Sequence, residues 1–376
     1  MQHTKILRTF AANKKIKAMK KDFFGLSIEI RIPVLLFLIV TILTDCSTQT
    51  NSSSVSYIDD IEIDTMYIEL HRLDLDEVPL YPMSCCFCGD NLVVEESKQT
   101  TDLFKIYNNQ KLVTKFGNIG PAAEDFTWQP RLYNQPKSND SCFWAKDGNK
   151  IVQYYLGTDG NVTHKNIVYF PDSIIPVNQV AYYQDSVLVF RKTDDYQLSF
   201  FDMKSNKISG YNFYDKPKSI ESASDYLLNM NLFMCSYGNY GDNIVCGYYN
   251  FKIIDIISAK QQKLIKRLYF SGYDANPIGM EDGFPIYDFN FLFYFDSVIV
   301  DEDGFYARSW DIPFIEKDRD NKGVSKIYRI DYDGHIQKLY AIKQIIRSFT
   351  IKDNEIYAIC LDPEEQEWMI YKGTLQ

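Results

Sequence analysis

The side chains that could do chemistry in this chain are few and scattered. Only three of the eight cysteines lie close together, Cys85, Cys86 and Cys88, and the chain has four histidines. Structural zinc usually takes two Cys-x-x-Cys pairs, or cysteines together with histidines. Because this run has no second pair, we expect no metal and no cofactor here, but small, half-apolar residues on an inner strand. Disulfide pairing stays open for the clustered cysteines and for Cys142, Cys235, Cys246 and Cys360.

Familiar catalytic motifs are missing from the sequence. It holds no Gly-x-Ser-x-Gly elbow, no phosphate-binding Gly-rich loop ending in Lys-Ser/Thr and no His-Glu-x-x-His. His71 and His164 are isolated, and His335 follows Asp333-Gly334 in an expected hairpin turn, where exposure is the simpler interpretation. The run Asp301–Gly304 could offer oxygen ligands to calcium, but it does not match an EF-hand loop, so a solvated turn is expected. The sequence therefore predicts no catalytic, cofactor-binding or metal-binding residue.

Cys46 is the one cysteine with a chemical role indicated by its surroundings. A basic segment at 13–21 precedes an apolar run at 32–43, and Ser/Thr-rich residues follow Cys46. This order is typical of a secretory signal, and the apolar run is short for a membrane span. Leu43-Thr-Asp-Cys46 resembles a lipobox, the cleavage site of lipoprotein signal peptides, although Asp45 departs from the usual small residue. We therefore expect lipid attachment at Cys46, with an uncleaved signal anchor as the alternative.

These features divide the chain into three parts. Residues 1–45 are the expected signal peptide. Its first 18 residues precede Met19-Lys-Lys, which is a more natural start of translation. Residues 46–55 are an expected flexible tether and 56–376 the folded domain. With no acidic run directly after Cys46, we favour a periplasm-facing location in the cell envelope over display at the cell surface.

Composition favours β structure in the folded domain. The chain has 28 tyrosines and 25 phenylalanines, residues that suit pleated, half-buried surfaces. The formal net charge is −10. Because a surface that binds nucleic acid needs clustered Lys and Arg, nucleic acid is not an expected partner.

An internal repeat specifies the fold further. Gly89-Asp-Asn-Leu-Val93 recurs as Gly241-Asp-Asn-Ile-Val245, with weaker copies elsewhere. Each copy contains one aspartate. When these aspartates are aligned, successive ones lie 57, 38, 57, 54 and 57 residues apart. They are expected to be turn residues, not ligands. The aligned set is Asp90, Asp147, Asp185, Asp242, Asp296 and Asp353.

Each unit continues with strand-like segments of alternating polarity, as at 103–107 and 111–115. About four antiparallel strands per unit is the content of a propeller blade. The sequence thus predicts an all-β, six-bladed β-propeller behind a lipoprotein signal peptide. Only 23 residues follow Asp353, so the strand-like segment 61–70 is expected to complete the last blade and close the ring. The stretches 271–289 and 311–324 are expected to be surface loops.

One connection resembles a known family. Phe116-Gly-Asn-Ile-Gly-Pro-Ala-Ala-Glu-Asp-Phe126 is similar to the Gly-x-x-Gly-x-Gly-Pro-x-Glu-Phe turn of TolB-like and NHL-like six-bladed propellers. Many of those are lipid-anchored proteins of gut-dwelling Gram-negative bacteria. The resemblance covers this turn, the repeat and the lipoprotein start, and it implies no catalytic residues. In itself the turn predicts a shaped connection between blades.

Two functions remain open from sequence. The first is a non-catalytic binding or scaffold protein, held at the membrane by its lipid and binding a protein or carbohydrate ligand on a propeller face. Tyrosines could line that face, although most are expected to pack between blades; the candidates are Tyr237, Tyr240, Tyr248 and Tyr249. The alternative is a metal-dependent hydrolase or lyase with its site at the central channel mouth. That alternative rests on analogy of fold alone.

Overall fold

The computed structural model describes residues 54–59, 63–133, 141–171, 180–183, 187–190, 198–202, 204–205, 207–211, 235–273, 278–281, 284–287, 292–313 and 324–375. The expected signal peptide, Cys46 and most of the expected tether lie outside these residues. No helix in the described part is long and apolar enough to cross a membrane.

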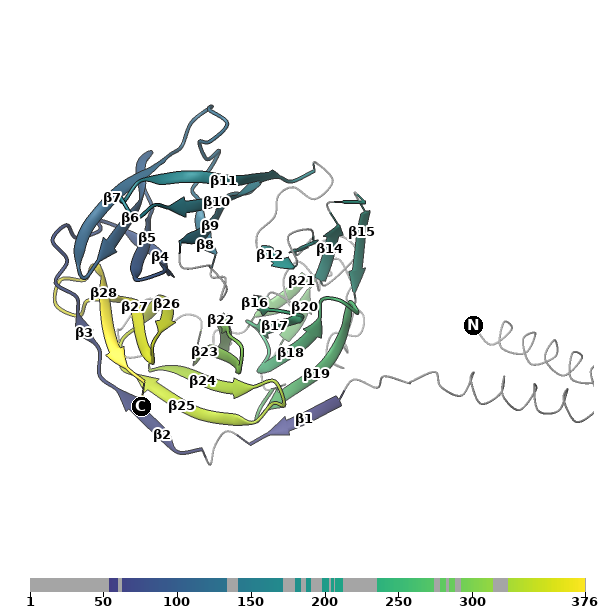
Figure 1. The fold of residues 1–376 in the computed structure, drawn as a ribbon. Helices are drawn as coiled ribbons and strands as arrows, with labels where there is room; N and C mark the ends of the chain where they lie inside the picture. Colours follow the sequence, from purple (N-terminus) through teal and green to yellow (C-terminus); the bar gives the residue numbers. More distant parts are fainter. Residues whose placement is uncertain are drawn as a thin grey trace, which may run out of the picture. The chain divides into compact units, whose positions relative to one another are not determined.

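Antiparallel sheets of four or more strands arranged around a common centre make up the fold (Figure 1). Sheet β4–β7 consists of β4 (Pro82–Cys88), β5 (Asn91–Glu96), β6 (Thr101–Asn108) and β7 (Lys111–Asn118). Sheet β8–β11 consists of β8 (Arg131–Tyr133), β9 (Cys142–Lys146), β10 (Lys150–Leu156) and β11 (Val162–Tyr169). Sheet β12–β15 consists of β12 (Val180–Tyr183), β13 (Val187–Phe190), β14 (Leu198–Asp202) and β15 (Lys207–Tyr211).

The other three large sheets come from the second half of the chain. Sheet β16–β19 consists of β16 (Cys235–Tyr240), β17 (Asn243–Tyr248), β18 (Ile253–Ser258) and β19 (Lys263–Phe270). Sheet β22–β25 consists of β22 (Leu292–Val300), β23 (Gly304–Pro313), β24 (Ser325–Asp331) and β25 (Ile336–Ile342). Sheet β26–β28 consists of β26 (Ile346–Lys352), β27 (Glu355–Leu361) and β28 (Trp368–Thr374).

This arrangement is a β-propeller, which confirms the predicted all-β class. Five sheets have nearly all of their side chains described and form five blades, one fewer than the sequence predicts. In the remaining sheet, β12–β15, the side chains of β12 and β13 are not described. The residues at 278–287, expected to be loop, instead form a hairpin of β20 (Ile278–Glu281) and β21 (Phe284–Tyr287).

Apolar side chains are buried between neighbouring blades. Phe104 of β6 and Phe143 of β9 lie in one cluster between sheets β4–β7 and β8–β11. Phe270 and Phe295 join sheet β16–β19 to sheet β22–β25 in the same way. The aromatic excess in the sequence is therefore largely used to fill the spaces between sheets.

The N-terminal strands run along the outer edges of three blades. β1 (Ser54–Ile58) pairs in parallel with β19, and β2 (Thr65–Ile68) pairs in parallel with β25. β3 (His71–Arg72) pairs antiparallel with β28 and supplies the fourth strand of the last blade. The prediction that 61–70 supplies the missing strand of the blade of Asp353 was therefore wrong. Closure by the N-terminal end is observed, but through the next two residues, while β2 covers the edge of the neighbouring blade.

The repeat aspartates divide into turn residues and exceptions. Asp90, Asp242 and Asp353 lie in the turn between the first and second strands of their blades, as predicted. Asp147 also lies in a turn, and its Oδ1 accepts hydrogen bonds from the backbone N–H groups of Asn149 (2.8 Å) and Lys150 (2.9 Å). That turn joins the second and third strands, which explains the short spacing after it. Asp185 lies outside the described residues.

Asp296 was wrongly predicted as a turn residue. It lies inside β22, where its carboxylate accepts hydrogen bonds from Arg308 Nε (2.8 Å) and from Trp310 Nε1 (2.5 Å). The turn of this blade comes later, at Asp301–Gly304. An aspartate between aromatic and aliphatic residues looks the same in sequence whether it turns the chain or pairs with a buried arginine.

Candidate functional site

Two consecutive glutamates at the end of β5 are completely buried. Glu95 and Glu96 each have 0% exposed surface. Successive side chains of a strand point to opposite faces of its sheet, so the two carboxylates lie on opposite sides of the blade. Since a buried carboxylate is costly unless it is paired, each side must supply partners.

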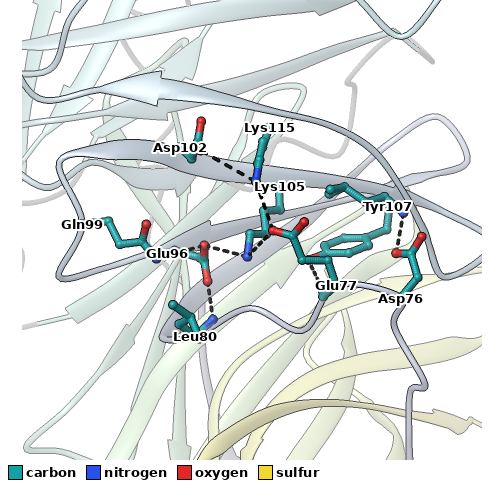
Figure 2. Close-up of polar contacts among 10 residues, drawn as sticks. Asp76, Glu77, Leu80, Glu96, Gln99, Asp102, Lys105, Tyr107 and Lys115 are labelled. Atoms are coloured by element: carbon teal, nitrogen blue, oxygen red, sulfur yellow. Dashed lines mark hydrogen bonds and ion pairs between the residues drawn. The ribbon is translucent and has the colours of Figure 1, made fainter.

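Glu96 lies in an ionic network that holds the segment before β4 (Figure 2). Its carboxylate lies 3.2 Å from Lys105 Nζ, and it accepts a hydrogen bond from the backbone N–H of Leu80. Lys105 Nζ also lies 3.1 Å from Glu77 Oε1, which pairs with Lys115 at 3.4 Å. The pKa of Glu77 is lowered, first by its hydrogen bond with Lys105. These contacts hold the segment before β4 in place, so the face of the sheet that carries Glu96 has a structural role.

Glu95 faces the next blade. Its carboxylate accepts hydrogen bonds from Ser84 Oγ (2.7 Å), Arg131 Nη1 (2.7 Å) and Gln129 Nε2 (3.4 Å). Burial raises the pKa of Glu95, and the charge of Arg131 opposes that rise. Arg131 begins β8 and leaves 43% of its side chain exposed. The buried carboxylate thus holds a half-exposed guanidinium at the first strand of the neighbouring blade.

A second guanidinium lies on the other side of β4. Arg347 of β26 stacks on Trp368, with its Cζ 3.7 Å from the ring centroid, and lies 5.2 Å from the ring centroid of Tyr81. Arg347 Nη1 donates to the backbone oxygen of Pro82 at 3.2 Å. Lys98 Nζ lies 3.8 Å from the same ring centroid. Hydrogen bonding with Arg347 and then Lys98 lowers the pKa of Tyr81.

Charge repulsion and burial act together on these groups. Burial lowers the pKa of Arg347, and the charge of Arg131 lowers it further while that of Glu95 raises it. Lys146, the residue paired with Arg131 in register, has its pKa lowered to about 8 by burial and by Arg131. Three blades therefore bring positive charges within electrostatic range of one another and of one buried carboxylate.

We refer to these side chains as the Glu95 cluster. Four basic groups, two aromatic rings and one carboxylate come together, and Arg131 and Arg347 lie on β8 and β26, first strands of their blades (Figure 1). Such a set can bind anions and stack against flat groups. The cluster consists of Tyr81, Glu95, Lys98, Arg131, Lys146, Arg347 and Trp368.

The candidate residues from the sequence lie elsewhere. Cys85, Cys86 and Cys88 are buried on β4, the predicted inner strand, and burial raises the pKa of Cys85 to about 12. Cys142, Cys235, Cys246 and Cys360 are likewise buried thiols. Cys46 lies outside the described residues.

The remaining candidates have structural partners. His335 is exposed in its turn, with Nδ1 3.1 Å from Asp331. Asp301 forms the predicted hairpin turn and pairs with Arg329 at 2.8 Å. Tyr237 and Tyr248 are buried, as expected for packing between blades. In the part of the chain that the structure describes, no three His, Cys, Asp or Glu side chains group so as to hold a metal ion.

The Glu95 cluster was not found from sequence. Its members are spread over nearly 290 positions, from Tyr81 to Trp368, and none belongs to a recognisable motif. The one local signal was Glu95-Glu96 at the end of an apolar strand. Two adjacent acids there indicate buried partners on both faces, but the sequence does not say which basic residues they meet.

Comparison with known proteins places the fold and leaves the family open. No family model and no curated protein matches the chain. Among solved structures, a Bacteroides fragilis protein described as a candidate exported protein aligns with a TM-score of 0.52 at 13% identity. The alignment covers 86% of this chain and 99% of that one.

Two further structures align less closely. Virginiamycin B lyase from Staphylococcus aureus has a TM-score of 0.48 at 12% identity, covering 82% of this chain and 100% of that one. The β-propeller domain of Myceliophteria thermophila Swd1 has a TM-score of 0.42 at 13% identity, covering 82% and 99%. At such identities these likenesses concern the fold alone.

Proposed function

We propose that this chain is a non-catalytic binding protein of the cell envelope. It is tethered to the membrane through a lipid on Cys46 and recognises a ligand with the propeller face that carries the Glu95 cluster. The observation that carries the proposal is the placement of Arg131 and Arg347 on first strands of two blades, on either side of β4. Loops and strand ends from separate blades can contact one ligand together at such a place.

The envelope location rests on the sequence and on one relative. The basic segment, apolar run and Leu43-Thr-Asp-Cys46 are typical of a lipoprotein start. The Bacteroides fragilis structure that aligns over most of this chain is described as exported. Both favour a protein that leaves the cytoplasm, with a periplasm-facing site as the preferred location.

We also propose that the ring has six blades. Sheet β12–β15 has four antiparallel strands in consecutive order, like sheets β4–β7 and β8–β11. β12 lies against β16, the first strand of the following blade. A sixth blade at this place fits the spacing of the sequence repeat.

In-cell photo-crosslinking tests the binding proposal. A photo-reactive residue is placed at Lys98, in the Glu95 cluster, or at exposed Lys111 on the outer strand β7 as the matched control. We expect a discrete adduct from position 98 that is lost when Arg347→Gln is added, and no such adduct from position 111. Equal products from both positions, or an adduct that is independent of Arg347, would contradict the proposal.

A further inference from the structure

We infer that the Glu95 cluster binds an oxyanion, the carboxylate or phosphoryl group of a small molecule. The inference rests on the proposed binding function and specifies the chemistry of the ligand.

Arg347 is the guanidinium of the cluster whose contacts with the described residues all go to uncharged groups. It hydrogen-bonds to the backbone oxygen of Pro82 (3.2 Å), to the sulfur of Met83 (3.0 Å) and to the side chain of Tyr81. No described carboxylate forms an ion pair with it, and the charge of Arg131 disfavours its protonated form. A partly buried cation in this position is costly unless an anion joins it. An oxyanion beside Arg347 would supply the missing charge.

Arg131 is held by a buried carboxylate and remains partly exposed. Nη1 donates to Glu95 at 2.7 Å and to the backbone oxygen of Pro130 at 3.3 Å. Nε and Nη2 have no hydrogen-bond partner among the described residues, and 43% of the side chain is exposed. Because Glu95 is completely buried and fixed by Ser84, the arginine is oriented before a ligand arrives. A pre-oriented fork of N–H donors is the geometry that recognises carboxylate and phosphate oxygens.

The charge balance selects an anion over a neutral ligand. Lys98 adds a third positive charge at the ring of Tyr81, and Glu95 is the carboxylate that contacts Arg131. This surplus occurs in a chain whose formal net charge is −10.

Direct binding to the full-length, detergent-solubilised protein tests the inference. Inorganic phosphate is the phosphoryl probe and trigalacturonate the carboxylate probe, with maltotriose as the neutral control, all at one ionic strength set by chloride. We expect binding by calorimetry to at least one oxyanion probe and none to maltotriose. Arg347→Gln should weaken that binding about 10-fold or more, the loss of one charge-assisted contact. Lys111→Gln on β7 should leave it unchanged.

The outcomes separate the sources of the oxyanion. Binding of phosphate alone identifies a phosphoryl ligand, and binding of trigalacturonate alone a carboxylate ligand. Binding of neither probe, or unchanged affinity in Arg347→Gln, overturns the inference. If Arg347→Gln does not fold, Lys98→Gln at an exposed position replaces it, with the expectation of a smaller loss. An Arg347-dependent crosslink in cells without oxyanion binding would overturn this inference and leave the proposed binding function standing.

Discussion

The carboxylate of Glu95 accepts a hydrogen bond from Arg131 Nη1 at 2.7 Å and so joins the second strand of one blade to the first strand of the next. Glu95 is completely buried, whereas Arg131 is half exposed. One residue further along β5, Glu96 makes its contacts on the opposite face of the sheet. The same two-residue sequence thus fixes a structural network on one side and orients a binding group on the other.

Removing Arg131 should destabilise the protein by leaving Glu95 buried without its cation. We expect Arg131→Met to lower the free energy of unfolding by about 2 kcal/mol, below the usual cost of a fully buried pair because Arg131 is half exposed. The double variant Arg131→Met/Glu95→Gln should recover much of that loss. Urea denaturation measures all three proteins, and no recovery in the double variant would contradict a role through Glu95.

Asp296 and Asp90 occupy equivalent places in the repeat but should respond differently to substitution. Asp296 pairs with Arg308, which has 2% exposed surface, so Asp296→Ala should cost about 3–5 kcal/mol of unfolding free energy. The side chain of Asp90 is 88% exposed and pairs with Lys352 at the surface, so Asp90→Ala should leave stability close to wild type. Similar losses for both in thermal and urea unfolding would show that the two aspartates share a turn role.

Gly373 sets the contact between the last blade and the N-terminal strands. A Cβ at this position would lie 2.7 Å from Leu70 Cδ2 and 2.8 Å from the backbone oxygen of Glu69. Gly373→Ala should therefore push this segment away from β28, lower the unfolding free energy by about 1–3 kcal/mol and increase proteolysis before residue 73. Thr374→Ala at the neighbouring exposed position is the control. Wild-type protease resistance in Gly373→Ala would show that the segment yields without detaching.

Lys146 should make stability depend on alkaline pH. Its pKa in the folded state is about 8, against 10.5 for an ordinary lysine, because of burial and the charge of Arg131, partly offset by Asp147. Between these two pH values the unfolded chain binds more protons, so stability should rise with pH through this window. Relative to Lys146→Met, we expect a gain of about 1 kcal/mol for the wild type. Parallel pH profiles of the two proteins would show that Lys146 has an ordinary pKa.

Cys46 should carry a lipid. Metabolic labelling with a fatty-acid analogue should mark the wild-type protein and leave Cys46→Ala unmarked, because a lipobox cysteine is the attachment point. Cys142→Ala, at a buried thiol, is the matched control and should label like the wild type. Equal labelling of the wild type and Cys46→Ala would refute the anchor.

The edges of the ring show where local sequence stops being informative. Alternating polarity correctly predicted strands such as 111–115, where exposed and half-buried side chains alternate along β7. The same pattern marked 61–70 as a strand, but not the partner edge it would choose. β2 pairs with β25, and β3 with β28, because backbone hydrogen bonding to an open edge is specified weakly by side chains and settled by where the preceding blades lie.

By itself the sequence determined the class of fold, the burial of Cys85, Cys86 and Cys88 on an inner strand, and the turn roles of Asp90, Asp242 and Asp353. These features depend on neighbours within a few residues, through turn chemistry and strand periodicity. Only the tertiary structure decided that Asp296 pairs with Arg308, that Arg131 contacts Glu95, and that Arg347 lies within electrostatic range of both. The Asp296–Arg308 pair joins neighbouring strands of one blade, whereas Glu95 and Arg131, 36 positions apart, lie on different blades and meet because the blades pack around a common centre.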